Sequence, residues 1–223
     1  MQSCTCEHPH ARTRIVLTGG PGAGKTAVLE LVRQYFCRHV HVLPEAASIL
    51  FSGGFPRGEH LGQRAAAQRA IFWVQRELEA ATDANEQPAI TLCDRGTIDG
   101  AAYWPGPGSL WSAVGTTLEA ELARYDAVIH LRTPEVSSYN HSNPVRIESA
   151  LEAAAIDERI AEAWSAHPQR FFVESSVDFM DKAQRAIELL RARLPPCCRV
   201  HEVPRERSAP ELRSPSIAAG KKP

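Results

Sequence analysis

Lysine is scarce in this chain of 223 residues: four of its 25 basic residues are lysine, and Lys25 is the single lysine before Lys182. A drift from lysine to arginine explains most of this scarcity but leaves Lys25 unexplained. The formal net charge of −1 argues against a protein that holds nucleic acid by bulk electrostatics. Uninterrupted apolar runs of the ~18 residues that a membrane-spanning helix needs are also absent. Residues 1–14 lack the apolar stretch of a signal peptide, so we expect a cytoplasmic protein with no membrane partner.

The six cysteines do not have the spacing of a secreted disulfide framework. Cys37 and Cys93 stand in apolar surroundings, and we predict that they are small core residues. Cys197 and Cys198 follow two prolines near the C-terminus. We expect these two to form an exposed pair in a C-terminal tail.

A C-x-C-x-H-x-H run near the N-terminus contains Cys4, Cys6, His8 and His10. Cysteine and histidine are typical zinc ligands, but the spacing matches no closed zinc-site pattern, and ligands packed so closely in sequence would strain a tetrahedral site. A frayed terminus is therefore favoured over a metal site.

The composition predicts one folded domain with flexible ends. Residues 204–223 contain four prolines, five basic and two acidic residues and almost nothing apolar. Such a segment cannot offset its ordering entropy. We therefore expect a folded domain over residues 13–194, a flexible N-terminus over residues 1–12 and a disordered tail over residues 195–223.

Short apolar strands alternate with helices along the folded region. This alternation predicts a three-layer α/β/α fold with a five-stranded parallel sheet. In the helix over residues 62–82 we expect one buried face with Ala67, Ile71, Val74, Leu78 and Ala81. The predicted strands are residues 14–18, 40–43, 89–93, 127–131 and 170–173, and the other predicted helices are residues 25–37, 110–125, 147–166 and 178–194.

A phosphate-binding loop (P-loop) of the form G-x-x-x-x-G-K-[ST] links the first strand to the first helix. Its glycines let backbone N–H groups surround phosphates, and the helix N-terminus adds a favourable dipole. Lys25 is expected to reach the β- and γ-phosphates of ATP, and the hydroxyl of Thr26 to bind Mg²⁺. The loop consists of Gly19, Gly20, Pro21, Gly22, Ala23, Gly24, Lys25 and Thr26.

Three further candidates follow the second and third strands, at the edge of the sheet where α/β folds bind ligands. Asp94 resembles a Walker B carboxylate that holds Mg²⁺; the alternative is a helix N-cap. Arg95 is placed to contact phosphate oxygens, or else pairs with Asp94 or Asp99. Glu45 is placed to take a proton from an acceptor hydroxyl, and the alternative is a surface residue that caps the next helix.

Arg146 lies on a predicted lid over residues 133–148, between two helical stretches. A lid arginine neutralises charge on the transferred phosphoryl group, whereas the alternative is a solvated side chain. Arg132 and Arg159 are weaker candidates for the same role. The aromatic side chains that could stack on a nucleobase are expected to pack in the core or on the surface instead; they are Tyr103, Trp104, Trp111 and Tyr139.

Four segments together resemble the NadR-like P-loop ATP-binding domain family, which includes the nicotinamide riboside kinase domain of NadR and the TRPL translocation defect proteins. They are the phosphate loop, residues 44–47 (Pro-Glu-Ala-Ala), residues 93–99 (Cys-Asp-Arg-Gly-x-x-Asp) and residues 143–148 (Asn-Pro-x-Arg-x-Glu). The resemblance spans about residues 13–190 and implies a fold like that of nucleoside and nucleotide kinases, with ATP and Mg²⁺ as ligands.

Carried over by position, the resemblance implies that Glu45, Arg95 and Asp99 face the acceptor and that Asp94 lies on the magnesium side. Arg146 would lie on the lid. In the related deoxynucleoside kinases a serine follows the Asp/Glu-Arg pair, where this chain has Gly96.

Two functions follow from these residues. The first is a kinase that transfers the γ-phosphoryl group of ATP to a hydroxyl of a nucleoside-like small molecule, with specificity set around Glu45, Arg64, Arg69 and Asp99. The second is an ATP-dependent switch that signals to a protein partner. A Ras-type GTPase is excluded, because the Asn/Thr-Lys-x-Asp motif that reads guanine there needs a lysine that the first 181 residues do not supply outside Lys25.

Overall fold

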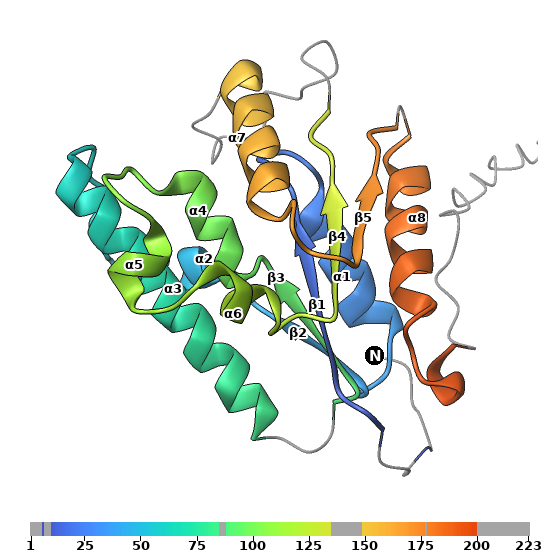
Figure 1. Ribbon diagram of the computed structural model, residues 1–223. Coiled ribbons are helices and arrows are strands. Elements are labelled where there is room, and N and C mark those ends of the chain that lie inside the picture. Colours follow the sequence, from blue (N-terminus) through green and yellow to red (C-terminus); the bar gives the residue numbers. More distant parts are fainter. Residues whose placement is uncertain (1–5, 7–9, 85–87, 135–148, 177, 200–223) are drawn as a thin grey trace, which may run out of the picture.

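The computed structural model describes residue 6 and residues 10–84, 88–134, 149–176 and 178–199. Its centre is a five-stranded sheet in the order β2-β3-β1-β4-β5, and every pair of neighbouring strands is parallel (Figure 1). The predicted parallel sheet is therefore confirmed. The strands are β1 (Thr13–Thr18), β2 (Val40–Leu43), β3 (Ile90–Asp94), β4 (Ala127–Leu131) and β5 (Arg170–Val173).

Helices cover both faces of the sheet and make the fold three-layered (Figure 1). One face packs against α1 (Lys25–Tyr35) and α8 (Phe179–Arg191). The opposite face packs against a larger group that includes α7 (Ala150–Ala163). The remaining helices are α2 (Ala46–Ser52), α3 (Leu61–Asp83), η1 (Thr97–Asp99), α4 (Gly100–Tyr103), α5 (Leu110–Val114), α6 (Leu118–Leu122) and η3 (Pro196–Cys198).

The central strand β1 divides its side chains between the two layers because successive residues of a strand point to opposite faces. Ile15 and Leu17 join the core under α1 and α8. Val16 joins the core on the other face, where the fully buried Trp164 follows α7. Side chains on both faces of β1 are buried, as is typical of a parallel sheet covered by helices.

The single helix that we predicted over residues 110–125 is two short helices, α5 and α6. Gly115 ends α5 with a φ of 74°, a conformation that glycine adopts without steric cost. Thr117 then caps α6, where its side chain accepts a hydrogen bond of 3.2 Å from the backbone N–H of Ala120. Strong local stop and start signals thus outweigh the continuous helical pattern.

The buried face of α3 also differs from the prediction. Ala67 is buried, as predicted. The other buried residues of α3 are Phe72, Gln75, Glu79 and Thr82, and not the predicted Ile71, Val74, Leu78 and Ala81. The reason is a polar network across the core. The carboxylate of Glu79 is fully buried and accepts hydrogen bonds from Gln75 Nε2 (2.9 Å), Tyr125 Oη (2.8 Å) and Arg124.

Cys37 and Cys93 are buried, as predicted. The exposed position predicted for Cys198 is wrong, because its side chain is 0% exposed and belongs to the core under α1 and α8. Structured backbone therefore extends to η3, beyond the predicted start of the tail. Within the described residues, the helices are too short or too polar to cross a membrane.

Candidate functional site

The predicted phosphate-binding loop joins the carboxyl end of β1 to the amino end of α1, as the motif requires. Gly24 precedes the helix with a φ of 93°, and no side chain caps the first turn. Gly19 has a φ of 136°, and a Cβ at this position would collide with the carbonyl oxygen of Leu131. The helix N-terminus therefore keeps unsatisfied N–H groups, which makes it suitable for an anion.

Lys25 lies folded across this loop. Its Nζ donates hydrogen bonds to the carbonyl oxygens of Gly19 (2.8 Å) and Gly20 (3.0 Å). Burial lowers the pKa of the ammonium group to about 7, and the nearby Arg95 guanidinium acts in the same direction, whereas Asp94 opposes both. A bound phosphate would place negative charge next to this ammonium group and would favour its protonated form.

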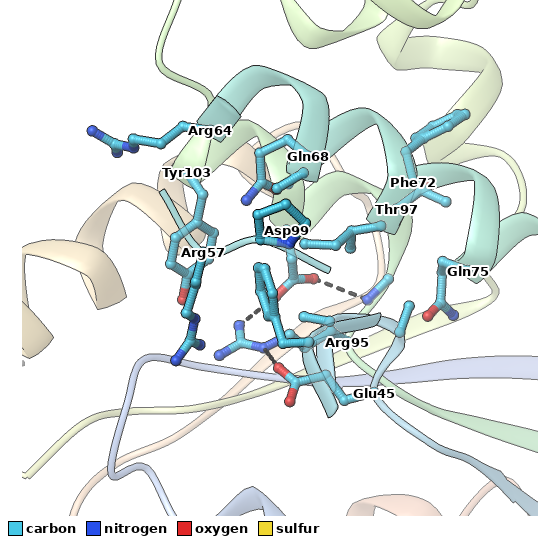
Figure 2. A pocket seen from close by; sticks show the side chains of 18 of the residues that line it. Glu45, Arg57, Arg64, Gln68, Phe72, Gln75, Arg95, Thr97, Asp99 and Tyr103 are labelled. Carbon is cyan, nitrogen blue, oxygen red and sulfur yellow. Dashed lines mark hydrogen bonds and ion pairs between the residues drawn. The ribbon is translucent and has the colours of Figure 1, made fainter. Parts of the chain in front are cut away.

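Glu45, Arg95 and Asp99 form a hydrogen-bonded chain beside the loop (Figure 2). Arg95 Nε donates to Glu45 Oε1 (2.7 Å), and Arg95 Nη1 donates to Asp99 Oδ1 (3.1 Å). Asp99 is 3% exposed, and its Oδ2 also accepts a hydrogen bond from Trp164 Nε1 (3.1 Å). The family resemblance implied acceptor-side positions for these three residues, and in the structure Glu45 and Asp99 both contact Arg95.

The charges in this chain stabilise each other. Burial by itself would raise the pKa of Glu45, but the Arg95 guanidinium and a hydrogen bond from Ser48 lower it below its ordinary value. Glu45 precedes α2 without capping it through its side chain, so the helix-capping alternative is wrong. Arg95 is a non-glycine residue with a φ of 69°, an uncommon conformation that neighbouring structure has to hold. Its backbone N–H donates to the carbonyl oxygen of Leu17 (3.1 Å).

Asp94 ends β3 with a carboxylate whose Oδ1 is buried and lacks a hydrogen-bond partner among the described residues. Burial raises its pKa to about 6, and the negative charge of Glu45 contributes to the shift. Thr26 is an exposed residue in the first turn of α1. Mg²⁺ prefers hard oxygen ligands. The Asp94 carboxylate and the Thr26 hydroxyl are both of this kind, so both residues fit Mg²⁺.

A cavity of about 680 Å³ is lined by residues of α2, of α3 and of the segment 95–103, and by Pro21 of the phosphate loop (Figure 2). Glu45, Arg95 and Asp99 lie on one side of it, and Tyr103 also lines it, although we expected that ring to serve packing alone. Arg64 is part of the lining, whereas Arg69 is not. The other lining residues include Pro21, Phe51, Arg57, Glu59, Gln68, Ile71, Phe72, Gln75, Gly96 and Thr97.

A profile of a protein family described as an AAA domain matches residues 14–182, which include the loop and all the site residues described above. The chain belongs to this AAA domain family. A thymidylate kinase from Candida albicans has a similar structure, with a TM-score of 0.56 and 14% sequence identity; the match covers 82% of this chain and 92% of the kinase. At this identity the likeness shows a shared fold, that of a P-loop nucleotide kinase. A search of curated proteins gave no significant match.

Asp157 on α7 is a residue of this AAA domain that the sequence did not single out. Its Oδ1 accepts hydrogen bonds from the backbone N–H of Gly20 (2.7 Å) and from His130 Nε2 (3.0 Å). Its Oδ2 accepts a hydrogen bond from Arg132 Nη1 (3.0 Å). Asp157 thus fixes the second residue of the phosphate loop from a helix more than a hundred residues away in sequence. The signal that could have identified Asp157 is its place on the face of α7 that also carries the apolar residues Ile156 and Ile160.

The remaining predicted arginines have separate positions. Arg146 and most of the predicted lid lie outside the described residues. Arg132 pairs with Asp157 and Glu158, and Arg159 Nε donates to the carbonyl oxygen of Ala102 (2.9 Å). In this structure Arg132 and Arg159 therefore hold elements together.

Gly96 lies against the core of the AAA domain, so substitution to serine should destabilise the protein. A Cβ at Gly96 would lie 2.9 Å from Cζ2 of Trp164 and 3.0 Å from Cγ2 of Val16, both buried. We expect Gly96→Ser to lower the free energy of unfolding by about 1–3 kcal/mol, the range typical of overpacking. Urea denaturation would measure this change. Gly62→Ser is the matched control, because nothing lies within 4 Å of a Cβ at Gly62; equal stability of the two variants would contradict the prediction.

Proposed function

We propose that this AAA domain is an ATP-dependent kinase that transfers the γ-phosphoryl group to a hydroxyl of a nucleoside-like small molecule. The observation that carries the proposal is the cavity beside the phosphate loop, with the Glu45–Arg95 pair on its wall. A protein that only binds ATP and signals to a partner has no need of a second pocket beside the phosphate loop. A phosphotransferase needs one to hold the acceptor next to the γ-phosphate and away from water.

In this proposal the phosphate loop and Lys25 hold the triphosphate, and Thr26 and Asp94 hold Mg²⁺. Bound Mg²⁺ supplies a positive charge that offsets the charge of the phosphate oxygens. Glu45 is the acceptor-side base. The Arg95 guanidinium holds the pKa of Glu45 below its ordinary value, so the carboxylate stays ionised at neutral pH despite its partial burial. An ionised carboxylate can accept a hydrogen bond from the acceptor hydroxyl.

Arg95 has two roles in the proposal. It orients Glu45 through the 2.7 Å ion pair, and it provides positive charge for the phosphoryl group as it approaches the acceptor. Asp99 fixes the guanidinium from the other side. We keep Arg146 as the arginine that the lid provides, a role inferred from its position in the sequence.

The lining of the cavity supports a nucleoside-like acceptor. Aromatic rings of Phe51, Phe72 and Tyr103 line the cavity together with the amide of Gln68. Rings and apolar walls suit a flat heterocyclic base, and amides suit its polar edges. Within the AAA domain family we place the chain with the NadR-like ATP-binding domains, and we infer a cytoplasmic location.

The direct test is ³¹P-detected transfer from ATP to a panel of nucleosides and nucleotides in the presence of Mg²⁺. With the acceptor that is found, Glu45→Gln should reduce turnover about 10²–10⁴-fold, since a general base contributes about that much. ATP affinity should change little, because Glu45 lies on the acceptor side of the loop.

Glu30→Gln is the matched control, since Glu30 is an exposed residue of α1 that pairs with Arg33. Tight ATP binding without transfer to any acceptor, together with normal ATP hydrolysis in Glu45→Gln, would overturn the kinase proposal. That result would favour the ATP-dependent switch.

A further inference from the structure

Three soft metal ligands meet in the core at the amino edge of the sheet. Cys37 follows α1, His39 precedes β2, and Cys198 belongs to η3 near the C-terminal end of the described chain. Their side chains are buried: Cys37 is 1% exposed, His39 4% and Cys198 0%. Their ligand atoms all lie within 4.8 Å of one another.

The spacing of the three atoms approaches one face of a tetrahedral zinc site. The separations are 3.3 Å between Cys37 Sγ and Cys198 Sγ, 3.5 Å between Cys37 Sγ and His39 Nδ1, and 3.2 Å between His39 Nδ1 and Cys198 Sγ. Zn–S bonds of about 2.3 Å and Zn–N bonds of about 2.0–2.1 Å place neighbouring ligands about 3.5–3.8 Å apart. Small rotations of the side chains would open the triangle by the few tenths of an ångström required.

Two residues of the N-terminal C-x-C-x-H-x-H run lie beside this cluster. The ring of His10 packs edge-on against the ring of His39, with centroids 5.0 Å apart. Cys6 Sγ lies 3.4 Å from His10 Nε2, and the carbonyl oxygen of Cys6 accepts a hydrogen bond from Arg38 (3.0 Å). The N-terminal run by itself matches no zinc pattern, but the fold brings Cys37, His39 and Cys198 next to it.

We propose that Cys37, His39 and Cys198 bind one Zn²⁺ ion, with Cys6 or His10 as the fourth ligand. Thiolate and imidazole ligands at tetrahedral spacing select zinc over the hard cations that carboxylates bind. Each cysteine loses its thiol proton to solvent on binding, and His39 binds through neutral Nδ1, so its proton lies on Nε2. Two thiolates and one imidazole leave the buried site without net charge before the fourth ligand is added.

The role of this zinc ion is structural. His39 accepts backbone hydrogen bonds from Ala89 (2.9 Å) and Ile90 (2.8 Å), so the cluster lies where β2 and β3 begin. The phosphate loop follows the end of β1, and in a parallel sheet these two edges are opposite. Zinc would tie the N-terminal segment, the α1–β2 turn and the C-terminal segment to the sheet, away from the nucleotide site.

The test uses the full chain without a histidine tag, purified under reducing conditions. Elemental analysis should find one zinc ion per chain, and replacement of zinc by Co²⁺ should give the thiolate-to-cobalt charge-transfer and tetrahedral ligand-field bands. Chelation should lower the melting temperature, and added Zn²⁺ should restore it. These readouts need no variant, so they do not depend on a substituted protein that folds.

Cys37→Ala and Cys198→Ala should each lower Zn²⁺ affinity by at least about tenfold. Cys93→Ala is the matched control, since Cys93 is also 0% exposed but lies in β3 outside the cluster. Comparison of Cys6→Ser with His10→Gln identifies the fourth ligand as the residue whose loss weakens binding. Absence of stoichiometric zinc in the reduced wild type, a Cys37–Cys198 disulfide in its place, or equal affinity of the Cys37 and Cys93 variants would overturn the proposal.

Discussion

Replacement of Lys25 by methionine should weaken ATP binding roughly 10- to 150-fold, because it removes a charge-assisted phosphate contact worth about 1.5–3 kcal/mol. Methionine has a similar length, so the packing across the loop is retained while the charge is lost. Titration calorimetry with ATP and Mg²⁺ measures the change. Without nucleotide, Lys25 contacts only the carbonyl oxygens of Gly19 and Gly20 among the hydrogen bonds described, so the fold should tolerate the substitution.

The pH dependence provides a second readout for the same residue. The pKa of Lys25 is lowered to about 7, so above this pH the ligand-free protein holds a neutral amine, and a bound triphosphate favours the protonated form. ATP binding should therefore take up a proton, and affinity should fall as the pH rises above 7. Calorimetry in buffers of different ionisation enthalpy should detect this uptake in the wild type and not in Lys25→Met.

Arg33→Met is the matched control for both measurements. Arg33 is on the same helix, loses the same charge on substitution, and pairs with Glu30 away from the loop. If Lys25→Met bound ATP as tightly as Arg33→Met, the assignment of the loop as the triphosphate site would be wrong.

The parts of the structure that could be predicted from sequence depend on neighbouring residues. The loop is one continuous motif, and its position between a strand and a helix follows from the apolar runs on either side. Glu45 and Asp94 follow directly from the ends of β2 and β3, because the carboxyl ends of parallel strands lie at one edge of the sheet. The role predicted for Lys25 follows from this motif, and composition supports it: the chain has arginine instead of lysine at every other basic position before Lys182, and a planar guanidinium is too broad for a glycine-lined loop.

The parts that could not be predicted depend on partners distant in sequence. The Glu79 carboxylate is buried because Arg124 and Tyr125, which come after β3 in the sequence, donate hydrogen bonds to it. No pattern within α3 alone predicts that this carboxylate faces the core. Asp157 contacts the loop 137 residues away. The two prolines before Cys198 predicted an exposed tail. Cys198 is buried instead, because it packs against Cys37, which is 161 residues away in sequence.

Asp94→Asn should remove Mg²⁺-dependent turnover and at the same time stabilise the ligand-free protein at neutral pH. Asp94 has a pKa of about 6, above its ordinary value of 3.8, because it is buried and lies near Glu45. An acid whose pKa is higher in the folded state binds its proton more tightly there, so stability falls as the pH rises from about 4 to 6 and stays lower above that range. A shift of about two units corresponds to about 3 kcal/mol at most.

Part of the gain in the free energy of unfolding is offset in the variant, because burying the asparagine amide without a hydrogen-bond partner also costs free energy. Oδ1 of Asp94 lacks a donor at this position among the described residues. We therefore expect a net increase of about 1–2 kcal/mol in the free energy of unfolding at pH 8, and a smaller one at pH 5. Urea denaturation without nucleotide at the two pH values measures both. Asp181→Asn, an exposed residue of α8, is the control and should show no such gain. A protein that is stabilised yet inactive would identify Asp94 as a carboxylate kept for its metal, since burial and Glu45 disfavour its charge more than Lys25 and Arg95 favour it. A destabilised variant would mean that the carboxylate has a structural partner in the fold.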